Sequence, residues 1–318
     1  MIARLQTGAG EREWASLLPG LPVPRAGGVC ELYRVAAQAL AYTGYPGAWG
    51  RLMALSGEAV APPLPCPLSA PGERPERRVL TGLTGMGFRE NRLVTGPEGL
   101  PGPEIVRAVL GECGAGRPVV LRGWAPHPHG LSLIAGLGPG GLLCGYTPDA
   151  TAGEPYLAAP PSGDLLLMLG PPSVPAEGLF AAAVAVARAQ WEEARPGAAD
   201  RYRAWIYLAA VGEGAALTEL AAGLSLLVEA RAAAGEFLGE VLPDLGSLPA
   251  AWVRRALGQY ELLANRAEPL AERLSAPGLV LTPEERAGLA GALETLAELD
   301  AEAANCLRRA PSADYPPG

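Results

Sequence analysis

Apolar and polar residues follow two different patterns along this chain, and the change between them divides it in two. In the first half, short apolar runs are separated by glycine and proline, a pattern typical of mixed helices and strands. The second half is dominated by alanine, leucine, glutamate and arginine at helical spacing. The proline-rich junction at residues 170–175 suits neither a helix nor a central strand. We therefore expect an α+β domain over residues 1–172, a helical bundle over 176–310 and a disordered tail at 311–318.

In the first half, helices are predicted where apolar residues recur every three or four positions and a glycine follows. These segments are 31–43, 48–55 and 103–113. Strands are predicted at shorter apolar runs, 118–122, 131–137, 142–146 and 164–169. The Gly-Pro-Gly-Gly sequence at 138–141 favours an antiparallel hairpin between the two middle runs. The region 61–100, heavy in glycine, proline and arginine, is interpreted either as an active-site lid or as a decorated crossover.

The second half is predicted to form about five helices. Their approximate ranges are 177–194, 199–211, 215–241, 249–275 and 283–309. Thr282 is a favourable N-cap for the last of them, because Pro283 fits the first turn and glutamates follow. The alanine-rich faces would allow close packing, against the first domain or against a second copy of the chain in a homodimer.

Composition and charge narrow the classes of function. The chain has 318 residues with a net charge of −8, which argues against general nucleic-acid or anionic-membrane binding. No run of about 20 uninterrupted apolar residues predicts a membrane span, and the first residues lack a signal-peptide core. The five cysteines are scattered without CxxC spacing, which fits reduced thiols better than disulfides or a zinc site. We expect a soluble, bacterial-type cytoplasmic protein without a metal or cofactor.

Three residues suggest a chemistry. Cys30 follows two glycines and opens the first predicted helix, and the chain's two histidines, His127 and His129, precede the predicted strand 131–137. Asp149 lies in the loop after the predicted hairpin. A cysteine at a helix start, a histidine at a strand edge and a carboxylate one hairpin later are the parts of a papain-like thiol site.

Each of these residues also has a simpler interpretation. Cys30 fits a buried structural thiol, and Asp149 fits an ordinary turn residue, in which case Thr147 or the backbone would orient the histidine. A metal site at the histidine pair is not expected, since no acidic or cysteine ligand is suitably spaced. The Ser-Gly-Glu sequence at 56–58 is interpreted either as the lining of a cleft or as a helix cap.

Five short segments carry a resemblance to a known family. They are residues 28–30, 52–59 and 116–121 of the first half and 201–205 and 229–234 of the second. On these segments the chain resembles the butirosin-biosynthesis-protein-H-like proteins. The N-terminal domain of that family is similar to the papain-like leader-cleaving peptidases of bacteriocin transporters, and a helical extension follows it.

The resemblance implies a papain-like cysteine-peptidase-type N-terminal domain with Cys30 as nucleophile, His129 as base and Asp149 as the orienting carboxylate. It implies an acyltransferase, or an amide or peptide hydrolase, that takes a small-molecule or peptidyl/acyl substrate. The family's named member transfers an acyl group from a carrier protein to an aminoglycoside, and many of its relatives have no known activity, so a carrier protein is a candidate partner. Papain-like peptidases place a glutamine about six positions before the cysteine, where this chain has Pro24. This difference favours the alternative of a non-catalytic binding or regulatory protein that keeps the fold as a pocket.

Overall fold

The computed structural model describes the elements of both halves of the chain. The described residues are 4–7, 10–13, 18, 21, 31–60, 75–95, 100–124, 127–138, 142–147, 156–158, 165–172 and 201–310. Within them the fold is α+β, with an antiparallel sheet in the first half and helices alone after residue 200. The predicted tail at 311–318 and the predicted helix 177–194 lie outside the described residues.

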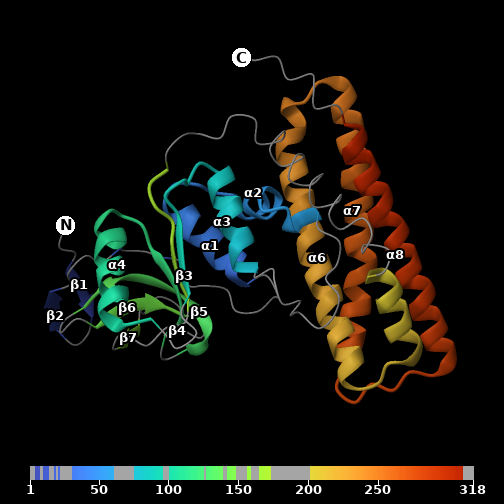
Figure 1. Cartoon of the computed structure of the whole chain (residues 1–318), viewed down its shortest axis with the longest axis horizontal. Coiled ribbons are helices and arrows are strands. Elements are labelled where there is room, and N and C mark those ends of the chain that lie inside the picture. Colours follow the sequence, from blue (N-terminus) through green and yellow to red (C-terminus); the bar gives the residue numbers. More distant parts are fainter. Residues whose placement is uncertain are drawn as a thin grey trace. The chain divides into compact units, whose positions relative to one another are not determined.

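A six-stranded sheet forms the centre of the first half (Figure 1), in the order β3-β8-β4-β5-β6-β7. The strands are β3 (Arg92–Thr95), β4 (Val119–Trp124), β5 (His127–Leu137), β6 (Leu143–Tyr146), β7 (Tyr156–Ala158) and β8 (Leu165–Met168). Every neighbouring pair is antiparallel. The predicted hairpin is confirmed, since Leu137 pairs with Leu143 across its end. A separate two-stranded pair joins β1 (Arg4–Thr7) and β2 (Gly10–Glu13).

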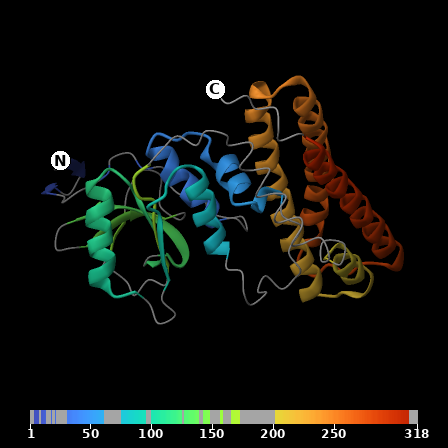
Figure 2. The same ribbon diagram turned by 45° about the horizontal axis from the view of Figure 1, so that its top comes forward.

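Helices cover both faces of this sheet (Figures 1 and 2). Successive side chains of a strand point to opposite faces, so the central strands contribute apolar residues to both helix layers. Helix α4 (Gly102–Gly114) packs on one face, where Val109 shares a core with Leu121 of β4 and Leu166 of β8. The intervening residues Val120, Leu133 and Leu167 are fully buried on the opposite face. Helix α1 (Glu31–Tyr42) contacts β4 and β5 there, through a buried apolar face. The two helices therefore enclose the central strands β4 and β5.

The first half holds further helices that the sequence analysis located only in part. Helix α2 (Ala48–Leu55) has the predicted bounds, and the 3-10 helix η1 (Glu58–Val60) follows it. Helix α3 (Pro75–Gly85) and strand β3 lie in the region whose interpretation had stayed open. The described part of region 61–100 is thus a helix followed by an edge strand of the sheet.

The second half is a bundle of long helices. Its members are the helical residues 201–211, α6 (Ala215–Val241), the 3-10 helix η3 (Leu242–Asp244), α7 (Ser247–Leu274) and α8 (Pro283–Arg309). The predicted start of the last helix is confirmed, because Thr282 and Glu285 form a reciprocal capping box. A Cβ added to Gly223 would come within 2.7 Å of the Trp205 ring, so glycine lets helix 201–211 pack closely on α6.

Backbone contacts group the described residues into two compact units. Of the described residues, those within 4–21, 31–52 and 79–172 form the unit that holds the sheet, and those within 53–60, 75–78 and 201–310 form the other unit. We call them the sheet unit and the helical unit. The helical unit thus includes η1 and the first turn of α3, and the domain boundary at 172–176 stays a prediction. None of the described helices is both long and apolar enough to cross a membrane.

Candidate functional site

The three residues of the predicted thiol site are only partly within the described chain. Cys30 and Asp149 lie outside the described residues. The backbone of His129 belongs to β5, two residues after His127, which pairs with Trp124 of β4. The side chain of His129 lies outside the described part. The arrangement of the three side chains therefore stays a prediction, and their described neighbours supply the geometry.

The neighbours of Cys30 and His129 are in direct contact. Glu31 is the first residue of α1, and its Oε1 accepts a hydrogen bond from the backbone N–H of Leu131 at 3.2 Å. Leu131 lies in β5, two residues after His129. The start of α1, where Cys30 precedes Glu31 in sequence, is thus joined to the strand that contains position 129. Sequence reasoning missed this contact, because 100 positions separate its partners.

The described cysteines of the first half are poor nucleophiles. Cys113 of α4 and Cys144 of β6 are buried in the core between α4 and the sheet. Burial raises the pKa of each thiol to about 12, with a smaller contribution from neighbouring negative charge at Cys113. The Sγ of Cys113 lies 3.5 Å from the carbonyl oxygen of Ile134. Both side chains are therefore neutral thiols that pack in the core.

Thr147, the alternative group for orienting the histidine, is fully buried. Its hydroxyl has no hydrogen-bond partner within the described part of the chain. In that part, no group of three or more histidine, cysteine, aspartate or glutamate side chains is placed to hold a metal ion.

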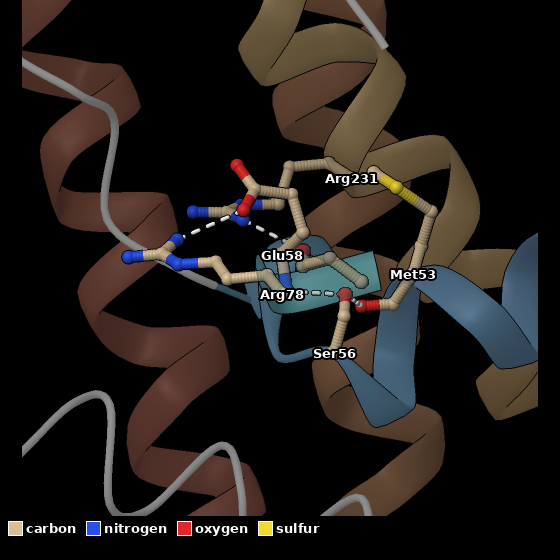
Figure 3. A network of polar contacts seen from close by, with 6 residues as sticks. Met53, Ser56, Glu58, Arg78 and Arg231 are labelled. Carbon is tan, nitrogen blue, oxygen red and sulfur yellow. Dashed lines mark hydrogen bonds and ion pairs between the residues drawn. The ribbon is translucent and has the colours of Figure 1, made fainter. Parts of the chain in front are cut away.

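The Ser-Gly-Glu segment at 56–58 caps a helix. Ser56 donates its hydroxyl to the carbonyl of Met53 at 2.8 Å and accepts the N–H of Glu58 at 3.2 Å (Figure 3). These bonds close the end of α2 and begin η1. The Glu58 side chain is largely buried and forms an ion pair with Arg78 of α3 at 2.8 Å. The capping interpretation of this segment is therefore confirmed.

A second polar cluster lies wholly within the helical unit and centres on Arg231 of α6. Its guanidinium makes two parallel hydrogen bonds to the carboxylate of Asp300 on α8, both at 2.8 Å. A third, at 2.7 Å, goes to the carbonyl oxygen of Ala59 in η1 (Figure 3). Tyr202 donates its hydroxyl to the same Asp300 at 3.2 Å, and the ring of Tyr260 on α7 lies under the guanidinium at 5.3 Å. The cluster therefore links all the long helices of the bundle to η1.

Electrostatics keep the buried Arg231 side chain charged. Burial alone would lower the pKa of Arg231, but the adjacent Asp300 carboxylate more than offsets this and leaves the pKa above its usual value. Burial also raises the pKa of Tyr202 and Tyr260, so both phenols stay neutral. The charged groups of the cluster are paired with each other, so we interpret the cluster as a structural contact between helices rather than a ligand site.

The two segments of the second half that carry the family resemblance supply this cluster. Tyr202 comes from residues 201–205 and Arg231 comes from residues 229–234, and both side chains are buried. Part of the resemblance therefore falls on residues that pack inside the bundle. Comparisons with known proteins add no assignment: neither a scan against protein-family models nor a search of curated proteins gives a match.

Proposed function

We propose that this chain is a papain-like thiol enzyme, an acyltransferase or an amide or peptide hydrolase, that uses Cys30 as nucleophile. His129 is its base, and Asp149 is the carboxylate that orients the imidazole. The observation that supports the proposal best is the hydrogen bond between Glu31 and the backbone of Leu131, which joins the residue after Cys30 to the residue two positions after His129. The packing of α1 on β4 and β5 gives the same support at the level of the fold.

The proposed chemistry follows from the residue types. The positive end of a helix dipole favours a thiolate, and an imidazole within hydrogen-bond reach takes the thiol proton. The sulfur of Cys30 then attacks the carbonyl carbon of the substrate, and the leaving group departs with the proton that His129 returns. The acyl thioester on Cys30 is resolved by an amine or by water, whose proton passes to His129. An amine acceptor gives acyl transfer and water gives hydrolysis.

The substrate in this proposal is a small molecule or a peptidyl or acyl group, and a carrier protein is the candidate donor. We place the protein in the cytoplasm because its scattered cysteines fit a reducing compartment. The net charge of −8 disfavours a nucleic-acid substrate.

The second candidate function is a non-catalytic pocket built on the same fold. Pro24, at the position where papain-like peptidases have the oxyanion glutamine, favours it. The two functions differ in one measurable property. An enzyme needs a thiolate near neutral pH, whereas a pocket does not.

The test is the alkylation rate of each cysteine by iodoacetamide, followed by peptide mass spectrometry between pH 5 and 9. We expect Cys30 to react well below the ordinary thiol pKa of about 8.5. Cys113 and Cys144 are expected to stay nearly unlabelled, because their thiols are buried.

Three variants assign the roles. His129→Ala is expected to slow the labelling of Cys30 near neutral pH, and Asp149→Ala to slow it by less. His127→Ala is the matched control, since it removes the neighbouring histidine, and we expect it to have little effect. If Cys30 of the unmodified protein labels no faster than Cys113, the enzyme proposal is wrong and the pocket takes its place.

A further inference from the structure

Glu31 contacts β5 at a place where, among the described residues, the strand is paired on one edge only. Leu131 pairs with Arg122 of β4, but the ladder between β5 and β6 begins two residues later, at Leu133 and Tyr146. In the part of the chain that the structure describes, β6 therefore does not pair with Leu131, and the carboxylate of Glu31 accepts the Leu131 N–H. Glu31 thus supplies the hydrogen bond that a longer β6 would otherwise make.

A carboxylate is well suited to this position. Glu31 lies in the first turn of α1, where the helix dipole stabilises negative charge. A hydrogen bond from a backbone N–H to a charged carboxylate is stronger than one between neutral groups. Glu31 is also half-buried, so water competes only in part for its Oε1. The contact consequently restrains the first turn of α1 against the backbone of β5.

We infer that Glu31 is a positioning residue: its hydrogen bond to the Leu131 backbone, which we call the clip, holds the start of α1 against β5 and so aligns the two segments that carry Cys30 and His129. This inference rests on the proposed function, because it assigns Glu31 a role in the same site. Glu31 does not react itself. Catalytic geometry of this kind tolerates little displacement, so losing the clip is expected to cost reactivity while the fold persists.

Two substitutions separate the clip from the charge. Glu31→Gln keeps an oxygen acceptor of the same size and removes the charge, whereas Glu31→Ala removes the acceptor as well. A negative charge beside a thiol disfavours the thiolate, so a role of the charge alone predicts faster labelling of Cys30 in both variants. The clip predicts slower labelling in Glu31→Ala and labelling near that of the unmodified protein in Glu31→Gln.

The experiment measures two quantities on the full chain. The first is hydrogen exchange at the Leu131 amide, which we expect to become about 10- to 100-fold faster in Glu31→Ala, as for the loss of one charge-assisted hydrogen bond, and to change little in Glu31→Gln. The second is the pH profile of Cys30 alkylation, whose rate at pH 7 we expect to fall about tenfold in Glu31→Ala, equivalent to one pKa unit. Glu104→Ala is the matched control, because Glu104 is an exposed acid in the first turn of α4.

The outcomes are distinguishable. The inference is supported if Glu31→Ala shows faster exchange and slower alkylation while Glu31→Gln leaves both close to those of the unmodified protein. Unchanged exchange at Leu131 overturns the clip, and faster exchange with unchanged alkylation overturns its role in positioning. If Cys30 of the unmodified protein is unreactive, the proposed function fails, while the exchange data still report whether the clip exists.

Discussion

The sheet unit and the helical unit bury polar residues in different ways. In the described residues of the sheet unit, the buried polar side chains are the hydroxyls of Ser132 and Thr147, and none is charged. The helical unit buries charged side chains, among them Arg231 and Asp300, each about 1% exposed. The sheet core therefore depends on shape and apolar area, whereas the bundle core also depends on an ion pair that must be complete. A pattern of apolar positions describes the first core well and the second only in part.

The largest expected effect comes from breaking the buried ion pair. Asp300→Ala leaves the guanidinium of Arg231 buried without the carboxylate that balances its charge, which is expected to lower the free energy of unfolding by about 3–5 kcal/mol. Urea unfolding followed by far-UV circular dichroism measures it. The double variant Arg231→Met/Asp300→Leu removes both charges and should be less destabilised than Asp300→Ala. A cost below about 1 kcal/mol for Asp300→Ala would show that the pair is not needed for the bundle.

The sheet core should respond instead to shape. A Cβ added to Gly145 of β6 would lie 2.7 Å from the carbonyl oxygen of Leu133 and 3.0 Å from the Trp124 ring. Because the nearest atom belongs to the backbone, we expect Gly145→Ala to cost about 1–3 kcal/mol in thermal or urea unfolding.

Gly111 is the matched control for this substitution. It lies in α4, and an added Cβ would meet nothing within 4 Å. Gly111→Ala should stabilise the protein by about 0.5–1 kcal/mol, because alanine has the higher helix propensity. Equal effects of the two substitutions would contradict the close packing at Gly145.

The buried thiols make the sheet core sensitive to alkaline pH. Burial raises the pKa of Cys144 in the folded protein to about 12, against about 8.5 for an exposed thiol. Its contribution to stability is therefore complete below pH 8.5 and is lost as the pH rises toward 12, because the unfolded chain releases this proton first.

The test is a comparison of unfolding free energies at pH 9 and pH 10. We expect Cys144→Ala to reduce the loss of stability over this interval by about 1 kcal/mol. The cavity that the substitution leaves lowers stability equally at both pH values, so it does not affect the difference. An unchanged pH dependence would show that Cys144 is ionised at the same pH in the folded and unfolded chain.

The sequence predicted the elements that have a clear apolar pattern. The central strands β4, β5 and β6 and the helices α1, α2 and α4 were found within a few residues of their predicted bounds. Strands β3 and β7 were missed, because β3 is a partly exposed edge strand with arginine and threonine, and β7 has three residues. Helix α3 begins with Pro-Glu-Arg-Arg after a proline-rich stretch, so its apolar face is too short to be recognised.

The polar contacts could not be predicted in the same way. Arg231 and Asp300 have the sequence pattern of solvent-facing residues on alanine-rich helices, and 69 positions separate them. Glu31 looks like an ordinary acid in the first turn of a helix, and nothing in the sequence relates it to Leu131. A single sequence gives residue types and spacing, but not which distant helix or strand lies opposite. Burial and partners of charged side chains therefore require the three-dimensional structure.

The smallest expected effect tests whether burial, rather than pairing, makes the Arg231–Asp300 contact strong. Arg255 and Glu302 form an ion pair at 2.7 Å between α7 and α8, but their side chains are 58% and 36% exposed. Water screens such a pair and its side chains lose entropy when they associate, so Arg255→Ala should cost only about 0–1 kcal/mol. The measurement is urea unfolding at low and at 1 M salt, and any small cost should vanish at high salt. Suppose that Arg255→Ala destabilised the bundle as much as Asp300→Ala. Charge pairing between helices would then stabilise the bundle equally at both sites, and burial would not be the reason that the Arg231–Asp300 pair matters.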